Sequence, residues 1–116
     1  MSKKDIEPKL SELMSNIAEC EGLIAANIDG KVIIGQTLTD MDHNSLAKLC
    51  ADIMKASVTL GGNLGKGDVK NTTVELDEGF AVIVGTEKVI YIGLVGIDGR
   101  PSLALLKRQL ISIAKS

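Results

Sequence analysis

Aromatic residues are almost absent from this sequence: Phe80 and Tyr91 are the only two, and there is no tryptophan. This scarcity argues against binding of single-stranded nucleic acid by base stacking. The net charge is −2, with acidic and basic residues interspersed, so no basic footprint for nucleic acid or an anionic membrane is visible. No apolar run approaches the roughly 20 residues that a membrane span needs. We therefore expect neither nucleic-acid binding nor direct membrane insertion.

The residues on which most enzyme chemistry depends are also scarce. Histidine occurs once, at His43, where we expect an exposed first-turn residue without a role; a two-histidine zinc site is excluded. The glycine-rich stretch 61–68 lacks the spacing and the strand-to-helix setting of a phosphate-binding loop. An enzyme that used Cys20 or Cys50 would need a nearby base, and His43 is the only histidine available. We expect no catalytic residue, no metal and no cofactor.

Cysteine is rare as well, and its two positions help to place the chain. Cys20 and Cys50 lie in apolar segments that we expect to be helical, where reduced packing cysteines are more common than a disulfide. The first nine residues lack the apolar core of a signal peptide, which favours a cytoplasmic location. The length of 116 residues, with 45% hydrophobic and 24% charged residues, predicts one packed domain over residues 1–116.

Five strands are predicted from the apolar runs and the turn residues. Residues 72–97 read as three consecutive strands with turns at 77–79 and 86–88, and Gly79 is free to take a positive φ. Strands 23–28 and 31–36 flank the hairpin signal Asp29-Gly30. The runs FAVIV and VIYIGLV do not alternate, which indicates a sheet covered on both faces. Strand 72–76 does alternate, is short and is the most polar, so we expect it at an edge.

Three helices supply the cover on the two faces. Residues 5–20 and the segment after Pro101 each carry a single apolar stripe, and we expect both on one face of the sheet. Gly22 is expected to end the first helix. The middle helix, 43–60, is capped by Asp40 or Asp42 and ends before Gly61-Gly62, and we expect it on the other face. The predicted class is α+β, with element order α-β-β-α-β-β-β-α.

The middle helix has more apolar surface than one sheet can cover. Its polar side chains fall within an arc of roughly 60°, whereas the apolar and small ones span roughly 220°. A second copy of the same helix, packed about a two-fold axis, would cover the excess, so we expect a homodimer. The expected interface consists of Ala47, Ala51, Met54 and Val58 from this helix and Thr72, Thr73, Val74, Glu75 and Leu76 from the edge strand. The expected partner-binding residues are Lys48, Asp52, Lys55 and Thr59, which form the polar stripe.

Two segments carry a resemblance to a known family. The first runs through a glycine into the hairpin, and the second joins the middle helix to the meander; they are LSELMSNIAECEGLIAANIDGKVIIGQ and HNSLAKLCADIMKASVTLGGNLGKGDVKNTTVELDEGFAVIV. In these segments and in element order the chain resembles the Roadblock family. The resemblance implies a profilin-like, five-stranded antiparallel sheet of order 2-1-5-4-3. It also implies a homodimer joined by the middle helix and the third strand, which binds a small Ras-like GTPase or acts as a scaffold without catalytic residues.

Two other interpretations deserve comparison. A small-molecule sensor of PAS- or profilin-like shape would show aromatic and polar residues converging on the sheet, and this sheet is almost wholly aliphatic. Arg100 lies in a turn, where an arginine finger for a GTPase would be possible. No second motif supports that role, so we expect Arg100 to be an ordinary loop cation.

Overall fold

The sheet has five antiparallel strands in the order β2-β1-β5-β4-β3, which confirms the predicted topology. A computed structural model describes residues 3–115; Met1, Ser2 and Ser116 of the predicted domain lie outside the described residues. The elements are α1 (Lys3–Asn16), β1 (Cys20–Asn27), β2 (Val32–Thr37), α2 (His43–Leu64), β3 (Thr72–Leu76), β4 (Gly79–Gly85), β5 (Val89–Gly96), the 3₁₀ helix η1 (Ile97–Ser102) and α3 (Leu103–Lys115).

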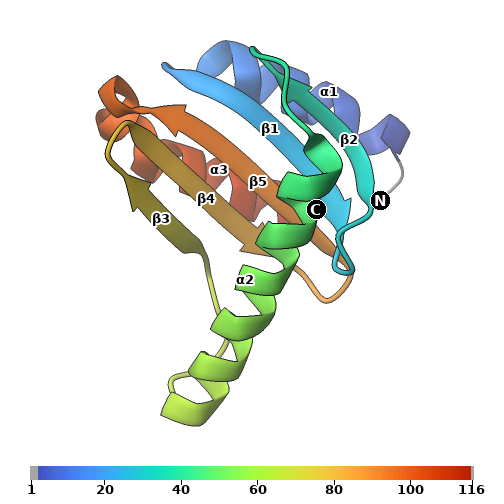
Figure 1. Cartoon of the computed structure of the whole chain (residues 1–116), viewed down its shortest axis with the longest axis vertical. Helices are drawn as coiled ribbons and strands as arrows, with labels where there is room; N and C mark the ends of the chain where they lie inside the picture. Colours follow the sequence, from blue (N-terminus) through green and yellow to red (C-terminus); the bar gives the residue numbers. More distant parts are fainter. Residues whose placement is uncertain (1–2, 116) are drawn as a thin grey trace.

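The helices cover both faces of the sheet, as the continuous apolar strands require. Helices α1 and α3 lie behind the sheet in Figure 1, and α2 crosses its front. Side chains on alternate strand positions therefore enter two separate cores. The larger core, on the side of α1 and α3, includes Ile6, Leu10, Leu23, Val82, Tyr91, Leu106 and Leu110. The smaller core, under α2, includes Ile24, Ala26, Ala47, Cys50, Ala51, Met54, Ile83, Ile90 and Ile92.

Local side-chain hydrogen bonds set the turns and the start of α2. At the β1–β2 hairpin, the amide of Lys31 donates to Asp29 Oδ1 at 3.3 Å and Gly30 has a φ of 92°. Asp42, rather than Asp40, is the N-cap of α2: its Oδ1 accepts from the amides of Asn44 and Ser45 at 3.1 and 3.2 Å. These bonds satisfy donors that the first turn of a helix leaves free.

The chain leaves α1 earlier than its apolar stripe predicts. The helix ends at Asn16, and Glu19 has a φ of 63°, so the chain turns into β1 before Gly22. Gly22 therefore lies inside β1 and does not end a helix, and Cys20 begins the strand instead of closing the helix. Gly79 also belongs to a strand, β4, and its φ is not positive.

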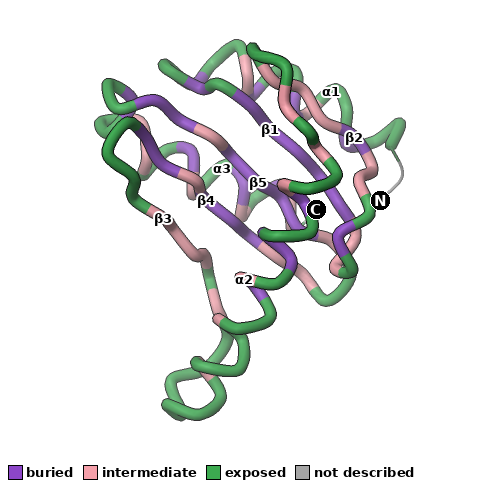
Figure 2. The backbone as a smooth tube through the Cα atoms, viewed as in Figure 1, coloured by how far each residue is buried: buried purple, intermediate pink, exposed green. Residues whose placement is uncertain are grey.

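Helix α2 is longer than predicted. It continues through Gly61 and Gly62 to Leu64 and ends at Gly65, whose φ of 64° is left-handed and whose amide faces the carbonyls of Gly61 and Gly62. The predicted end before Gly61 was wrong because a glycine inside a helix costs only about 1 kcal/mol, so Gly61 and Gly62 do not end the helix. The left-handed C-cap strongly favours glycine and lies at Gly65. The last turns of α2 extend beyond the strands and are exposed (Figures 1 and 2). No helix within residues 3–115 is long and apolar enough to cross a membrane.

Candidate interaction surface

The first turn of α2 is fixed to β2 by His43. Its Nε2 lies 2.9 Å from Thr37 Oγ1, and its ring covers Gly35 so closely that a Cβ there would be 2.6 Å from Nδ1. His43 is consequently half-buried, not exposed as predicted, and it has a structural role. The position of α2 on the sheet is thereby set at its N-terminal end, next to the Asp42 cap.

Below this turn, one face of α2 packs on the sheet of its own chain. Ala47, Ala51 and Met54 are 0, 1 and 3% exposed and contact the smaller core. Their small or flexible side chains let the helix approach the strands, which is why this arc of α2 faces inward. The predicted dimer interface included these three residues, and their burial leaves them no surface for a second chain. Val58, the fourth predicted residue of the helix, is 55% exposed.

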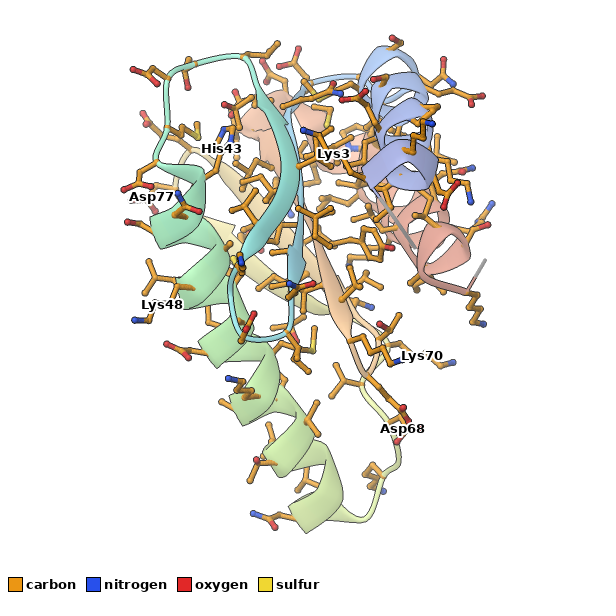
Figure 3. The ribbon with its side chains drawn as sticks, turned by 90° about the vertical axis from the view of Figure 1, so that its right-hand side faces the viewer. Lys3, His43, Lys48, Asp68, Lys70 and Asp77 are labelled. Carbon is orange, nitrogen blue, oxygen red and sulfur yellow. The ribbon has the colours of Figure 1, made fainter. Side chains whose placement is uncertain are left out.

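The polar stripe of α2 is solvent-exposed at all of its predicted positions, Lys48, Asp52, Lys55 and Thr59. It turns toward the β1–β2 hairpin, because a Cβ on Gly30 would lie 2.8 Å from the Cα of Lys48. Figure 3 shows the Lys48 side chain pointing away from the sheet into solvent. The stripe thus lies on the side of α2 away from β3.

The arc of α2 next to the stripe, about 100° further round the helix, carries apolar residues that are exposed or half-buried. We call it the outer flank: Leu49, Ile53, Ala56 and Leu60. Leu49 and Leu60 are 60 and 58% exposed, and Ile53 is half-buried. The flank turns toward β3, because the neighbouring Ser57 accepts a hydrogen bond of 2.9 Å from Thr72 Oγ1 at the start of that strand. The excess apolar surface expected of this helix is therefore present, and its exposed part is the outer flank, whereas Ala47, Ala51 and Met54 face the sheet.

A groove separates the first half of α2 from the β3–β4 hairpin. Its volume is about 590 Å³, and its apolar lining includes Leu46, Leu76 and Leu94. Glu21, Asp77 and Glu78 also line it and give it an acidic rim. The outer flank, this groove and Leu76, which is 57% exposed, place apolar groups on the side of the sheet that α2 covers.

Strand β3 occupies the edge, as predicted, and among residues 3–115 it has a neighbour only on the β4 side. Its predicted interface residues are half-buried at Thr72, Thr73 and Val74 and exposed at Glu75 and Leu76. Glu75 accepts a hydrogen bond of 2.8 Å from Arg100 Nη2, and the Arg100 guanidinium lies 4.9 Å from the centroid of the Phe80 ring. Arg100 therefore ties η1 to the edge strand.

Other chemistry is poorly supported by the described residues. Burial raises the pKa of both cysteine thiols, so each stays protonated and weakly nucleophilic at neutral pH. Both thiols are free, and they belong to different cores on opposite faces of the sheet. No group of three histidine, cysteine or carboxylate residues within residues 3–115 is arranged to hold a metal ion.

Comparisons with known proteins agree with this architecture. A Roadblock/LC7 domain from Streptomyces avermitilis has a TM-score of 0.80 and 20% identity, covering 90% of this chain and 88% of that chain. MglB from Myxococcus xanthus has a TM-score of 0.79 and 18% identity, covering 97% of this chain and 90% of that one. LokiProfilin1, in a complex with rabbit actin, has a TM-score of 0.58 and 18% identity over 99% of this chain and 94% of that chain, which confirms the profilin-like fold.

The family assignment comes from the sequence as well as the fold. A comparison with curated proteins finds no match. A family model for the Roadblock/LC7 domain, however, matches residues 8–99, which is most of the chain. Its range extends from the second turn of α1 to η1 and so includes α2 and all five strands. The chain therefore belongs to the Roadblock/LC7 domain family.

Proposed function

We propose that this chain is a non-catalytic homodimeric regulator or scaffold that binds a small Ras-like GTPase. The observation that carries the proposal is the outer flank of α2 beside the open edge of β3. Large exposed apolar patches on small soluble proteins mark protein interfaces, and a free strand edge offers backbone donors and acceptors to a second strand. The Roadblock resemblance implies the same two elements as the dimer interface.

The proposed interface is formed by the exposed outer flank of α2 and not by Ala47, Ala51 and Met54, which are buried against the sheet. Leu49, Ile53, Ala56 and Leu60 would meet their counterparts, or the groove of the second copy, while β3 pairs with β3 across the two-fold axis. The β3 residues remain in the proposed interface. Val58 lies away from the outer flank, beside Ile28 and Thr86, and is not part of it. Such an isologous arrangement buries the same patch on both copies and leaves no strand edge open at the junction.

The GTPase is proposed to contact the polar stripe, Lys48, Asp52, Lys55 and Thr59. Because the stripe faces the β1–β2 hairpin, the two stripes of a dimer would lie on its outer sides and would not meet at the axis. Each stripe combines two cations with one anion on a helix fixed by its own cap and by His43. Charges at such a rim govern association rate and partner choice more than intrinsic affinity.

The dimer is tested by sedimentation of the unmodified chain and of the double variant Leu49→Asp/Leu60→Asp at micromolar concentration. We expect a dimer for the first and a folded monomer for the second, because the variant buries four carboxylates at the proposed junction. The matched control is Leu38→Asp, a leucine that is 71% exposed and lies outside α2 and β3. It should leave the dimer unchanged. A folded, monomeric unmodified chain would contradict the proposed dimer.

GTPase binding is tested with the purified Ras-like GTPase that co-purifies with the chain, in its GDP form and bound to a GTP analogue. The double reversal Lys48→Glu/Lys55→Glu should lower the association rate at least tenfold. The association rate of the unmodified chain should itself depend strongly on salt concentration, because salt screens the charges of the stripe. The control reversal Lys107→Glu/Arg108→Glu lies on α3, behind the sheet. If the stripe variant Lys48→Glu/Lys55→Glu binds as fast as the unmodified chain and as the α3 control, the stripe is not the docking site.

A further inference from the structure

A second concave site lies on the opposite side of the sheet from the outer flank. It has a volume of about 560 Å³ and is bounded by the connector 66–70, the end of β4 and the last turns of α3. Cavities of roughly 300–1,000 Å³ are the usual size for small ligands in proteins. Neither the outer flank nor the polar stripe contributes a residue to its lining, so the cavity does not depend on the interfaces proposed above.

The floor of this cavity is aliphatic. Val84, Ile111 and Ala114 line it from the sheet and from α3, and Val69 lines it from the connector. No aromatic side chain is among the described lining residues, so the site offers no platform for stacking a nucleobase. An alkyl group is the ligand body that matches branched aliphatic walls, because its burial removes apolar surface from water on both partners.

The rim is basic. Lys66, Lys70 and Lys115 line the cavity, and Asp68 is the one carboxylate among its described lining residues. No ion pair of Lys66, Lys70 or Lys115 is found within residues 3–115, so these three ammonium groups are available for an external anion. Figure 3 shows Asp68 and Lys70 on the connector that rises from the lower end of α2. An anionic group bound at the rim would interact with cations from both the connector and α3.

The connector that carries two of these lysines is held at its two ends. The amides of Gly65 and Lys66 donate to the carbonyls of Gly62 and Gly61, and Thr72 begins β3. Between them, the backbone of residues 67–70 forms no hydrogen bond with other described backbone groups, and Val69 is its packing anchor. A segment of this kind adjusts to a ligand at low energetic cost, and its free amides add donors for an anion.

We propose that this cavity binds a small aliphatic anion, a compound with an alkyl body and a single carboxylate or phosphate monoester. The alkyl body would lie on Val84, Ile111 and Ala114, and the anionic group would lie among Lys66, Lys70 and Lys115. A bound ligand would also fix the connector that leads directly into β3. The site is formed within one chain and requires neither the dimer nor the GTPase.

The test uses two-dimensional amide NMR titrations of the full chain with decanoate and decyl phosphate, both below their micelle concentrations. We expect saturable shifts in the amides of 66–70 and 111–115. The stronger of the two ligands identifies the anionic group. Decyltrimethylammonium, which has the same chain and the opposite charge, and acetate, which has the charge without the chain, should bind at least tenfold more weakly.

Two charge variants locate the anionic group. Lys70→Glu/Lys115→Glu should weaken binding at least tenfold, whereas Arg108→Glu, on α3 but outside the lining, should leave the affinity unchanged. Circular dichroism of each variant checks the fold. Absence of saturable shifts with either anion overturns the proposal. It is overturned equally if decyltrimethylammonium binds as well as decanoate, or if the shifts map to Leu49 and Leu60 instead.

Discussion

The carboxylate of Asp42 joins the loop after β2 to the first turn of α2. The Ser45 hydroxyl donates to its Oδ2 at 2.8 Å, and the amides of Ser45 and Asn44 donate to its Oδ1. The Ser45 hydroxyl is the main cause that lowers the pKa of Asp42 below its ordinary value, and the two amides add to it. A carboxyl group with a lowered pKa in the folded state stabilises the fold when ionised, so this contribution is present at neutral pH.

We predict that Asp42→Ala lowers the melting temperature at pH 7 by about 3 to 8 °C, because the first turn loses its cap. The difference from the unmodified chain should begin to shrink below the unfolded carboxyl's pKa of roughly 4. It should vanish only as the pH falls through the lower folded pKa of Asp42, where the carboxylate takes up a proton. Asp42→Asn caps without titrating and should show no such shrinkage. Thermal unfolding at pH 7 and pH 2.5 measures this, and an equal difference at both would contradict it.

At the scale of single residues, the sequence predicted some roles and missed others. The cap was reduced to two candidates, Asp40 and Asp42, because short acidic residues at a helix start have a local reason to be there. The role of His43 depends on Thr37 and Gly35, which reach it only after the β1–β2 hairpin has formed. No local pattern contains that contact, so His43 was assigned no role.

At the scale of elements, α2 shows what periodicity can and cannot decide. Its spacing predicted a helix with too much apolar surface for one sheet, and the exposed outer flank confirms the excess. Periodicity could not choose which apolar arc faces inward, because both arcs contain residues at spacings of three and four. Packing decides: the arc with Ala47 and Ala51 lets the helix approach the strands closely, and the bulky arc with Leu49 and Leu60 stays outside.

The length of α2 leads to a paired prediction about two nearby glycines. Gly62 is helical and exposed, with no atom within 4 Å of an added Cβ, so Gly62→Ala should stabilise the chain by roughly 0.5 to 1 kcal/mol. Gly65 has a φ of 64°, so Gly65→Ala should destabilise it by about 1 kcal/mol. Urea unfolding of both variants checks this. If Gly62→Ala destabilises as much as Gly65→Ala, the helix ends before Gly62.

Strand β3 has its own prediction, which concerns the amides that face away from β4. In the proposed dimer they pair with the second copy, so they should exchange with deuterium slowly. In the Leu49→Asp/Leu60→Asp monomer they face water and should exchange at least tenfold faster, while Leu38→Asp retains the protection. Residue-resolved hydrogen exchange measures both. Fast exchange in the intact dimer would mean that the edge is open.

At the scale of the whole molecule, the sheet topology was the most accurate prediction. The continuous apolar strands FAVIV and VIYIGLV require cover on both faces, and the short alternating strand belongs at an edge, so few arrangements remain. The order 2-1-5-4-3 itself came from the family resemblance, since strand patterns do not specify neighbours. The connector cavity was not predicted, because 66–70, β4 and α3 are far apart in sequence and carry no shared motif.

For the assembled molecule we predict a stability that depends on protein concentration. Dimerisation stabilises the folded chain by mass action, so the melting temperature should rise by a few degrees for each tenfold increase in concentration. The Leu49→Asp/Leu60→Asp monomer should melt at one temperature throughout a range of about 1 to 100 µM. Differential scanning calorimetry is the measurement, and a concentration-independent melting temperature for the unmodified chain would contradict the prediction.

The last turns of α2, which extend beyond the sheet, have a consequence for the lifetime of the chain in a cell. Residues 62–68 are exposed, and they include Leu64, Gly65 and Gly67. A protease needs a segment that it can unfold locally, and a helix end with few tertiary contacts followed by a glycine-containing connector meets that need. If assembly covers this end, a newly made copy without a partner is degraded sooner than a paired one. The level of the protein would then follow the supply of its partners.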